Sequence, residues 1–323
     1  MTYNVRVQSI LPGTALLLRK VVGATFLYCS VFHGSRRDLR SSISFNQSRK
    51  SNHDSIITYN GSVKNEEVMI EVVFLGVGEA FDEALPNTSI LIRFDSGNSP
   101  VTVLLDCGFT ATPRFWKEAP EPDSLDVIWI SHFHGDHALG LPPLLVRAWE
   151  EGRRKVLIIL GQEGISAYTR QAVDLAYPGF YEKLAFPIKF TEIEPGGNVE
   201  LLGLTFRTAE TSHSQRNLAL RIDAGGKPIY YSGDGKPTPE STLLAQGCHL
   251  IIHEAFHMET ELPTHGTVTG SVDMAKRSGA SHLALVHIQR KARAQVIENL
   301  ERLRGLAGSV QLMVPEPGDR IAL

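Results

Sequence analysis

Short apolar or alternating runs, each about the length of a strand, recur along the chain from residue 69 to its end. They lie at 69–76, 88–94, 101–106, 126–131, 155–160, 186–193, 198–203, 204–210, 218–223, 228–234, 249–255, 282–288 and 310–314. Helical periodicity occurs at 138–152, 163–176, 239–247, 268–279 and 292–305. Some strands follow one another after short turns, whereas others are separated by helices. This mixture predicts an α/β protein with mixed (α+β) sheets enclosed by layers of helices.

Residues 1–68 lack this pattern. The stretch 35–55 is rich in Arg and Ser, and residues 1–67 carry nine basic and four acidic side chains. Such a composition is typical of a disordered tail or a transit-type leader. It would also fit an extension that is not native, because Met69 directly precedes the first convincing strand. We therefore expect a disordered or non-native extension over 1–68 and one domain over 69–323.

The overall composition is that of an ordinary globular protein, with 42% hydrophobic and 21% charged residues, and the chain is long enough to bury a sizeable core. Cys29, Cys107 and Cys248 are scattered without C-x-x-C spacing, which argues against a disulfide framework and against a thiolate zinc site. This cysteine usage suits the cytoplasm, with organelle targeting by residues 1–68 left open. No apolar run has the length of a membrane span, so we expect no membrane association.

The densest chemistry lies in "SHFHGDHALG", where His132, His134, Asp136 and His137 occupy six positions directly after an apolar run. Imidazoles and carboxylates are preferred ligands of zinc. In an extended loop His132 and His134 point to the same side, because side chains alternate with period 2. Gly135 permits a tight turn, after which Asp136 and His137 face a second point. The loop therefore predicts a metal site.

Three further candidates follow apolar runs elsewhere: His213 in "TSHSQRN", Asp234 in "YYSGDG" and His287 in "ALVHIQ". Singly each is weak evidence, since a lone histidine at a strand end is more often structural. Together with the loop, however, they give five histidines and two carboxylates. That number is sufficient to hold two zinc ions per chain, with one aspartate bridging the ions and open positions left for water.

The order H-x-H-x-D-H, then His, then Asp in "SGD", then His resembles the metallo-β-lactamase superfamily. The segments "FLGVGEAF", "LLDCG", "IIHEAF" and "THGT" resemble its ribonuclease Z branch, and the resemblance covers residues 69–323. It implies a four-layer αβ/βα sandwich that forms a hydrolase domain. It also implies that His132, His134 and His213 hold one zinc ion, that Asp136, His137 and His287 hold the other, that Asp234 bridges the two, and that Asp106 orients ligands.

The chemistry expected of such a site is phosphodiester hydrolysis. Two zinc ions lower the pKa of a bound water, so that metal-bound hydroxide is available near neutral pH. Asp136 is expected to accept a proton from that water. The resemblance implies that His265, in "THGT", protonates the leaving oxygen and that Glu254, in "IIHEAF", orients His265. We therefore expect a phosphodiesterase of the ribonuclease Z type, an endonuclease that processes tRNA 3′ ends.

Several departures keep an alternative open, namely a zinc hydrolase of a small ester, lactone or cyclic phosphodiester. Where ribonuclease Z usually has "GDT" and "HST", this chain has "GDG" (233–235) and "HGT" (265–267). The interval 161–186 reads as an ordinary helix and loop instead of a long RNA-gripping arm. Residues 68–323 are net acidic, whereas RNA binding draws on clusters of Lys and Arg. The partner is thus a phosphodiester, with RNA as one candidate; a homodimer, common in the family, stays open.

Two short basic stretches lie near predicted functional segments. One comprises Arg153, Arg154 and Lys155, and the other comprises Arg290, Lys291 and Arg293. We expect both to be solvated surface. The second begins three residues after His287, so contact with a substrate phosphate is an alternative for it.

Overall fold

Residues 68–97 and 100–323 are described in full by the computed structural model of the chain; before them it describes only the backbone of three short strands. These strands, β1 (Leu16–Leu18), β2 (Phe45–Arg49) and β3 (Ser55–Tyr59), form a sheet in the order β1-β3-β2. They belong to a unit spanning Met1–Glu66, and a second unit spans Glu67–Leu323. The remainder of the extension expected over 1–68 lies outside the described residues, so its disorder stays a prediction.

The second unit contains two seven-stranded mixed sheets. The order of the first sheet is β17-β4-β5-β6-β7-β8-β9. Its strands are β17 (Arg320–Ala322), β4 (Met69–Gly76), β5 (Ser89–Asp95), β6 (Val101–Leu105), β7 (Val127–Ile130), β8 (Leu157–Gly161) and β9 (Ile188–Glu192). The pairs from β17 to β6 are antiparallel, and those from β6 to β9 are parallel.

The second sheet has the same division into an antiparallel and a parallel half, in the order β10-β11-β12-β13-β14-β15-β16. Its strands are β10 (Asn198–Leu201), β11 (Leu204–Thr211), β12 (Asn217–Asp223), β13 (Ile229–Tyr231), β14 (Leu250–Glu254), β15 (His282–Val286) and β16 (Gln311–Met313). The pairs from β10 to β13 are antiparallel, and those from β13 to β16 are parallel.

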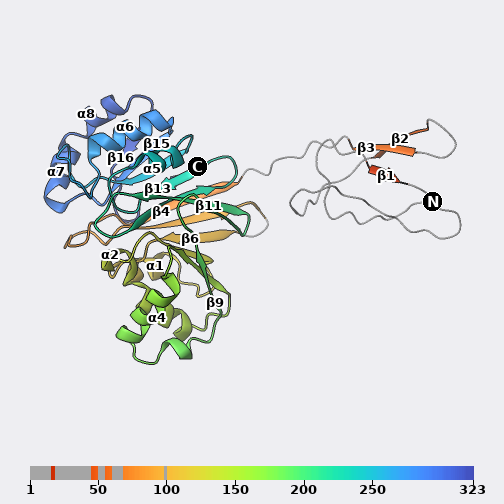
Figure 1. Cartoon of the computed structure of the whole chain (residues 1–323), viewed down its shortest axis with the longest axis horizontal. Helices are drawn as coiled ribbons and strands as arrows, with labels where there is room; N and C mark the ends of the chain where they lie inside the picture. Colours follow the sequence, from red (N-terminus) through yellow and green to blue (C-terminus); the bar gives the residue numbers. More distant parts are fainter. Residues whose placement is uncertain (1–15, 19–44, 50–54, 60–67, 98–99) are drawn as a thin grey trace. The chain divides into compact units, whose positions relative to one another are not determined.

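Helices lie on the outer face of each sheet (Figure 1). The first sheet is covered by α1 (Ala111–Glu118), α3 (Leu141–Glu150) and α4 (Ile165–Ala176). The second is covered by α6 (Val268–Ser278), α7 (Arg290–Glu298) and α8 (Leu300–Ala307), with α5 (Pro239–Leu244) beside them. The shorter α2 (Gly135–Ala138) follows β7, and a 3₁₀ turn lies at Tyr181–Lys183.

Alternation of side chains along each strand divides the core into three layers. In β7, Val127 and Trp129 pack between the two sheets, whereas Ile128 and Ile130 pack under the helices of the first sheet. All four are fully buried, as expected for a parallel strand with both faces covered. A third apolar layer joins the second sheet to its own helices. This helix–sheet–sheet–helix order confirms the predicted four-layer αβ/βα sandwich.

The structure differs from the sequence prediction at two elements near the carboxyl terminus. Strand β17 was not predicted, since three residues are too few to show a period; it pairs with β4 in antiparallel register. The single helix predicted over 292–305 is two helices, α7 and α8, which are separated at Asn299. The side chain of Asn299 donates to the carbonyl of Gln295, a local bond that competes with continuation of the helix.

The parallel halves of the two sheets decide where chemistry takes place. Ligands of open α/β sheets bind beyond the carboxyl ends of the strands, and the segments that follow β6, β7, β13, β14 and β15 carry most of the candidate residues named above. Glu254 is the last residue of β14, and His213 follows β11 in the antiparallel half. Among the described residues, no helix has both the length and the apolar character needed to cross a bilayer.

Candidate metal centre

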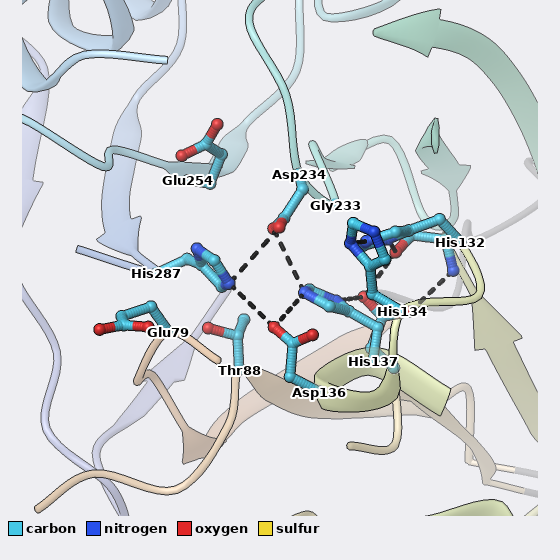
Figure 2. Close-up of polar contacts among 12 residues, drawn as sticks. Glu79, Thr88, His132, His134, Asp136, His137, Gly233, Asp234, Glu254 and His287 are labelled. Carbon is cyan, nitrogen blue, oxygen red and sulfur yellow. Dashed lines mark hydrogen bonds and ion pairs between the residues drawn. The ribbon is translucent and has the colours of Figure 1, made fainter. Parts of the chain in front are cut away.

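The structure brings together all seven residues that the sequence predicted as metal ligands. Figure 2 shows the segments after β7, β13 and β15 converging, with the side chains of Asp136, His137, Asp234 and His287 turned toward one another. His132 and His134 lie beside them, and His213 completes their group. The seven side chains form two groups, described in turn.

The first group consists of His132, His134 and His213. His132 is fully buried, and its Nε2 lies 2.9 Å from Nδ1 of His134. Nε2 of His213 lies 3.2 Å from the same His134 atom. His132 can donate its Nδ1–H to Ser131 Oγ, and His213 can donate its Nδ1–H to the Thr264 carbonyl. In these tautomers both Nε2 atoms direct lone pairs into the group, as ligands of a shared cation do.

The second group consists of Asp136, His137, Asp234 and His287, all of them buried. Nε2 of His137 lies 3.2 Å from Asp136 Oδ2 and 3.3 Å from Asp234 Oδ1. Nε2 of His287 lies 3.3 Å from Asp136 Oδ2 and 3.4 Å from Asp234 Oδ2. The same Asp234 Oδ2 is 3.8 Å from Nε2 of His213 in the first group. Asp234 therefore lies between the two groups.

The donor atoms of both groups fit zinc. Four ligands held tetrahedrally at about 2.0–2.1 Å lie about 3.3 Å from one another. Apart from the 3.8 Å between Asp234 and His213, the distances above run from 2.9 to 3.4 Å. Within the described part of the chain, His137 Nε2 and Asp234 Oδ1 are buried without a hydrogen-bond partner. Buried polar atoms ordinarily have partners, so these two atoms indicate a ligand.

The electrostatics of the cluster favour the cation-binding forms of His132 and of the two aspartates. Burial lowers the pKa of His132 well below its usual value, and the neighbouring His137 lowers it further. Burial alone would raise the pKa of Asp234, but the His287 and His137 imidazoles outweigh that effect and hold it well below its usual range. Hydrogen bonds from His137 and His287 likewise lower the pKa of Asp136 against the effect of burial. A neutral imidazole and ionised carboxylates are the forms that ligate metal. At His137 and His287 neighbouring carboxylates, above all Asp234, outweigh burial and raise the pKa, so a cation has to displace a proton from these two rings.

Asp106 fixes the loop that carries His132 to His137 through hydrogen bonds on the side away from the ligand atoms. Its fully buried carboxylate accepts the backbone N–H and the hydroxyl of Ser131, the Nδ1–H of His137 and the hydroxyl of Tyr231, each at 2.7 Å. With Nδ1 of His137 donating to Asp106, its Nε2 is left unprotonated toward the second group. Sequence reasoning missed Ser131, Tyr231 and Thr264 as partners of the ligand residues. The position of Ser131 directly before His132 was the only signal.

Glycines after Asp106 explain how the two loops approach so closely. The amide of Cys107 donates to the carbonyl of His137 at 2.7 Å, and the amide of Gly140 donates to the carbonyl of Cys107 at 2.8 Å. A Cβ atom on Gly108 would lie 1.9 Å from the Asp136 carbonyl oxygen, and one on Gly140 would lie 2.2 Å from the Gly108 carbonyl oxygen. Any side chain at either position would push the Asp136 segment out of place.

His265 and Glu254 lie at the edge of the cluster. His265 could join His213 and Asp234 in a third group of ligands, and its ring stacks on Phe256 at 4.3 Å between centroids. Its Nδ1 lies 3.4 Å from Glu254 Oε1 and forms no hydrogen bond. Glu254 Oε1 instead accepts the backbone N–H groups of the two glycines at 235 and 266, at 2.9 and 2.7 Å. The structure thus places Glu254 between the two loops that carry Asp234 and His265.

One departure from ribonuclease Z follows from this packing. Gly235, where that family usually has threonine, has a φ of +106°, a conformation that residues with a Cβ seldom adopt. A Cβ there would lie 2.5 Å from Thr211 Oγ1. The amide of Gly235 donates to Glu254 Oε1 at 2.9 Å on the other side. The "GDG" sequence is therefore what this local structure requires.

The basic stretches are only in part the solvated surface that the sequence suggested. Arg153 is buried and donates to the carbonyls of Pro122, Leu125 and Val156. Arg293 is also buried and donates to Pro315 and Glu316. Arg290 forms an ion pair with the buried carboxylate of Glu79. These guanidinium groups have partners within the fold, which their spacing in the sequence could not show.

Comparisons with known proteins agree with the fold. The family described as "Beta-lactamase superfamily domain" matches residues 101–288. Ribonuclease Z of Methanosarcina acetivorans is 26% identical over 277 residues, covering 69% of this chain and 88% of that protein. Ribonuclease Z of Bacillus velezensis is 25% identical over 297 residues, covering 75% and 94%.

Solved structures share the architecture at lower identity. The metallo-beta-lactamase fold protein YhfI from Bacillus subtilis has a TM-score of 0.63 at 22% identity and covers 79% of this chain and 100% of its own. Human tRNase Z, short form, also has a TM-score of 0.63, at 20% identity, and covers 78% and 98%. At these identities the likeness concerns the fold alone.

Proposed function

The chain belongs to the beta-lactamase superfamily and is a metal-dependent hydrolase, and from that premise we propose that it is a binuclear zinc phosphodiesterase acting on RNA, as ribonuclease Z does. One observation carries the proposal. Seven ligand side chains form two groups of zinc-like geometry, and Asp234 lies between them. Relatives named ribonuclease Z, which this chain matches over most of their length, supply the substrate class.

The chain's own residues have the following proposed roles. His132, His134 and His213 would hold one zinc ion, Asp136, His137 and His287 would hold the other, and Asp234 would bridge them. When bound, the ions would activate water and neutralise phosphate oxygens. The Asp136 carboxylate accepts the proton of the attacking water. His265, whose Nδ1 faces Glu254, donates a proton from Nε2 to the leaving oxygen.

Space for the substrate lies next to the proposed proton donor. A pocket of about 530 Å³ opens beside His265 and is bordered by Lys236, Glu261 and Arg277. Lys236 is paired with Glu261 across this pocket. The two cationic side chains suit a phosphate-bearing leaving group, and two carboxylates beside them, Glu261 and Asp273, limit how much anionic charge the pocket accepts.

Hydrolysis of a small ester, lactone or cyclic phosphodiester is the second candidate. It is favoured by the interval 161–186, where the structure has the twelve-residue helix α4 and a 3₁₀ turn in place of an extended arm. The net acidic charge of residues 68–323 favours it as well, since binding of an RNA backbone draws on basic clusters. A cytoplasmic location stays a prediction from the sequence, and a homodimer stays a possibility that rests on analogy with the family alone.

The deciding experiment compares three substrates under one set of conditions: a precursor tRNA, bis(p-nitrophenyl) phosphate and a panel of lactones. We expect cleavage of the tRNA and of the phosphodiester, loss of both activities on chelation, and recovery with zinc. Metal analysis should find two zinc ions per chain, and Asp234→Ala should lose metal. Turnover of lactones without cleavage of either phosphodiester would reject the proposal in favour of the second candidate.

A further inference from the structure

His287 differs from three other histidines of the cluster in how its ring is held. The outer ring nitrogens of His132, His137 and His213 contact Ser131, Asp106 and the Thr264 carbonyl, respectively. Nδ1 of His287, by contrast, is buried without a hydrogen-bond partner among the described residues. Metal-ligating histidines almost always have such a partner, which fixes the ring. Some other feature must therefore hold His287 in place.

The backbone around His287 supplies part of that support. His287 has a φ of +52°, which is uncommon for a residue with a side chain and persists only where the surroundings enforce it. Its amide donates to the carbonyl of Val77 at 2.9 Å, and Ile288 forms a parallel bridge with Gly78. The strained turn that aims His287 is thus attached to the start of the loop between β4 and β5.

An ion pair also joins the β4–β5 loop to the segment after His287. Glu79 is 2% exposed, and its carboxylate pairs with the guanidinium of Arg290 while also accepting the amide of Phe81 at 2.8 Å. In Figure 2, Glu79 lies on the same side of the cluster as His287. A buried carboxylate requires a counter-charge, and Arg290 provides it from the first residue of α7. The pair therefore couples the β4–β5 loop to the segment that immediately follows His287.

We propose that the Glu79–Arg290 ion pair is a positioning device for His287. The His287 ring has no hydrogen-bond partner at Nδ1 among the described residues, and the ion pair compensates by fixing the backbone that carries the ring. The inference rests on the proposed metal centre and adds an asymmetry to it. Loss of the pair weakens zinc binding by Asp136, His137 and His287, and it leaves the group formed by His132, His134 and His213 intact.

The test is a zinc titration of the full chain against a chromophoric chelator, which measures both affinities without any turnover. In Glu79→Gln we expect one zinc ion to bind about 10–100-fold more weakly, the usual effect of losing an outer partner, and the other to bind as before. Arg290→Gln should behave alike. Arg290→Lys, which keeps a cation near Glu79, should recover part of the affinity. Arg293→Gln, on the same helix, is the matched control and should leave both affinities unchanged.

Cobalt substitution gives a second readout, because the visible spectrum of Co²⁺ reports the geometry of its ligands. The Glu79→Gln spectrum should change for one ion only. Two unchanged zinc affinities in Glu79→Gln and Arg290→Gln would overturn the inference, as would an equal loss at both ions together with a fall in melting temperature. Wild-type protein that binds fewer than two zinc ions would instead overturn the proposed centre. If Glu79→Gln does not fold, the Arg290 variants decide.

Discussion

Replacement of Asp106 by asparagine tests whether a residue outside the ligand set controls zinc binding. Asp106 Oδ2 accepts from Ser131 Oγ, His137 Nδ1 and Tyr231 Oη, whereas Oδ1 accepts only the amide of Ser131. Asparagine keeps one acceptor but places an N–H₂ group against three donors. Asp106 has a φ of +57°, which asparagine tolerates better than most residues. Asp106→Asn therefore changes the hydrogen bonding without adding backbone strain.

The expected magnitudes follow from the burial of the carboxylate, which is complete. Removing one partner of a buried ionic contact costs about 3–5 kcal/mol. At about 2–4 °C for each kcal/mol in a domain of this size, the melting temperature should fall by about 6–20 °C. The His137 ring also loses the contact that fixes its tautomer, so zinc affinity should fall by about 10–100-fold.

The assay is thermal melting combined with a zinc titration, and the chain offers a matched control. Asp126 lies at the opposite end of β7, where its buried carboxylate accepts the amide of Thr102 at 3.0 Å and pairs with Lys155 at 2.5 Å. Asp126→Asn should lower the melting temperature and leave the zinc affinity unchanged. If Asp106→Asn loses stability but binds zinc like the wild type, then Asp106 supports the fold alone and our account of His137 is wrong.

Three further predictions concern other parts of the molecule. His265→Ala should keep both zinc ions and lower turnover of a phosphodiester by about 10²–10⁴-fold. Steady-state kinetics should show a smaller loss for substrates with a p-nitrophenolate leaving group. Equal losses for good and poor leaving groups would mean that His265 positions the substrate. Residues 67–323 alone should fold and bind zinc, as circular dichroism and metal analysis would show; an insoluble or metal-free product would contradict this. Arg320→Met should cost about 1 kcal/mol at pH 7. Burial raises the pKa of the Glu71 and Glu118 carboxyls, but their contacts with Arg93 and Arg320 outweigh it and lower the pKa below 4.5. Their ion pairs therefore stabilise the fold fully above pH 4.5, and the difference in melting temperature between wild type and Arg320→Met should vanish as the pH falls through the lowered pKa values. A difference that does not depend on pH would refute this.

The strands were predictable because their side chains obey a local rule. Every predicted run from 69–76 to 310–314 overlaps a strand, with ends that agree to within a few residues, and the alternation in β7 divides its residues between two core layers. Strand β17 escaped prediction because its three residues are defined by pairing with β4, about 250 residues earlier in the chain. Local patterns predicted most elements that have their own period, although they missed the short helix α1, and they cannot show an element that exists only through a distant partner.

The same distinction applies to the metal centre. Ligand residues were predictable since their chemistry is unusual and each follows an apolar run. Their supports were not, because serine, tyrosine and glutamate are common and act here through contacts across 125 residues (Tyr231 with Asp106) and 211 residues (Arg290 with Glu79). Arg153 was wrongly predicted to be solvated surface. Its guanidinium donates to three backbone carbonyl groups that the sequence pattern does not show.

Glu254 could serve as a catalytic partner of His265, as the sequence predicted, or as a structural anchor, since in the structure it accepts two backbone N–H groups. Glu254→Gln keeps an acceptor for the amides of Gly235 and Gly266 but removes the negative charge that lies 3.4 Å from His265 Nδ1. Glu254→Ala removes both, which leaves two buried amides unpaired at about 1–3 kcal/mol each.

If Glu254 acts mainly by anchoring the loops that carry Asp234 and His265, Glu254→Gln should retain both zinc ions and most of its stability, while Glu254→Ala should lose several degrees in melting temperature and bind zinc more weakly. Melting curves and metal analysis of the two variants, measured side by side, make the comparison. Equal destabilisation of both variants would show that the charge itself holds the loops. A Glu254→Gln variant that keeps metal and stability but loses phosphodiesterase turnover as severely as His265→Ala would restore the role predicted from the sequence, since charge is then the property that His265 requires.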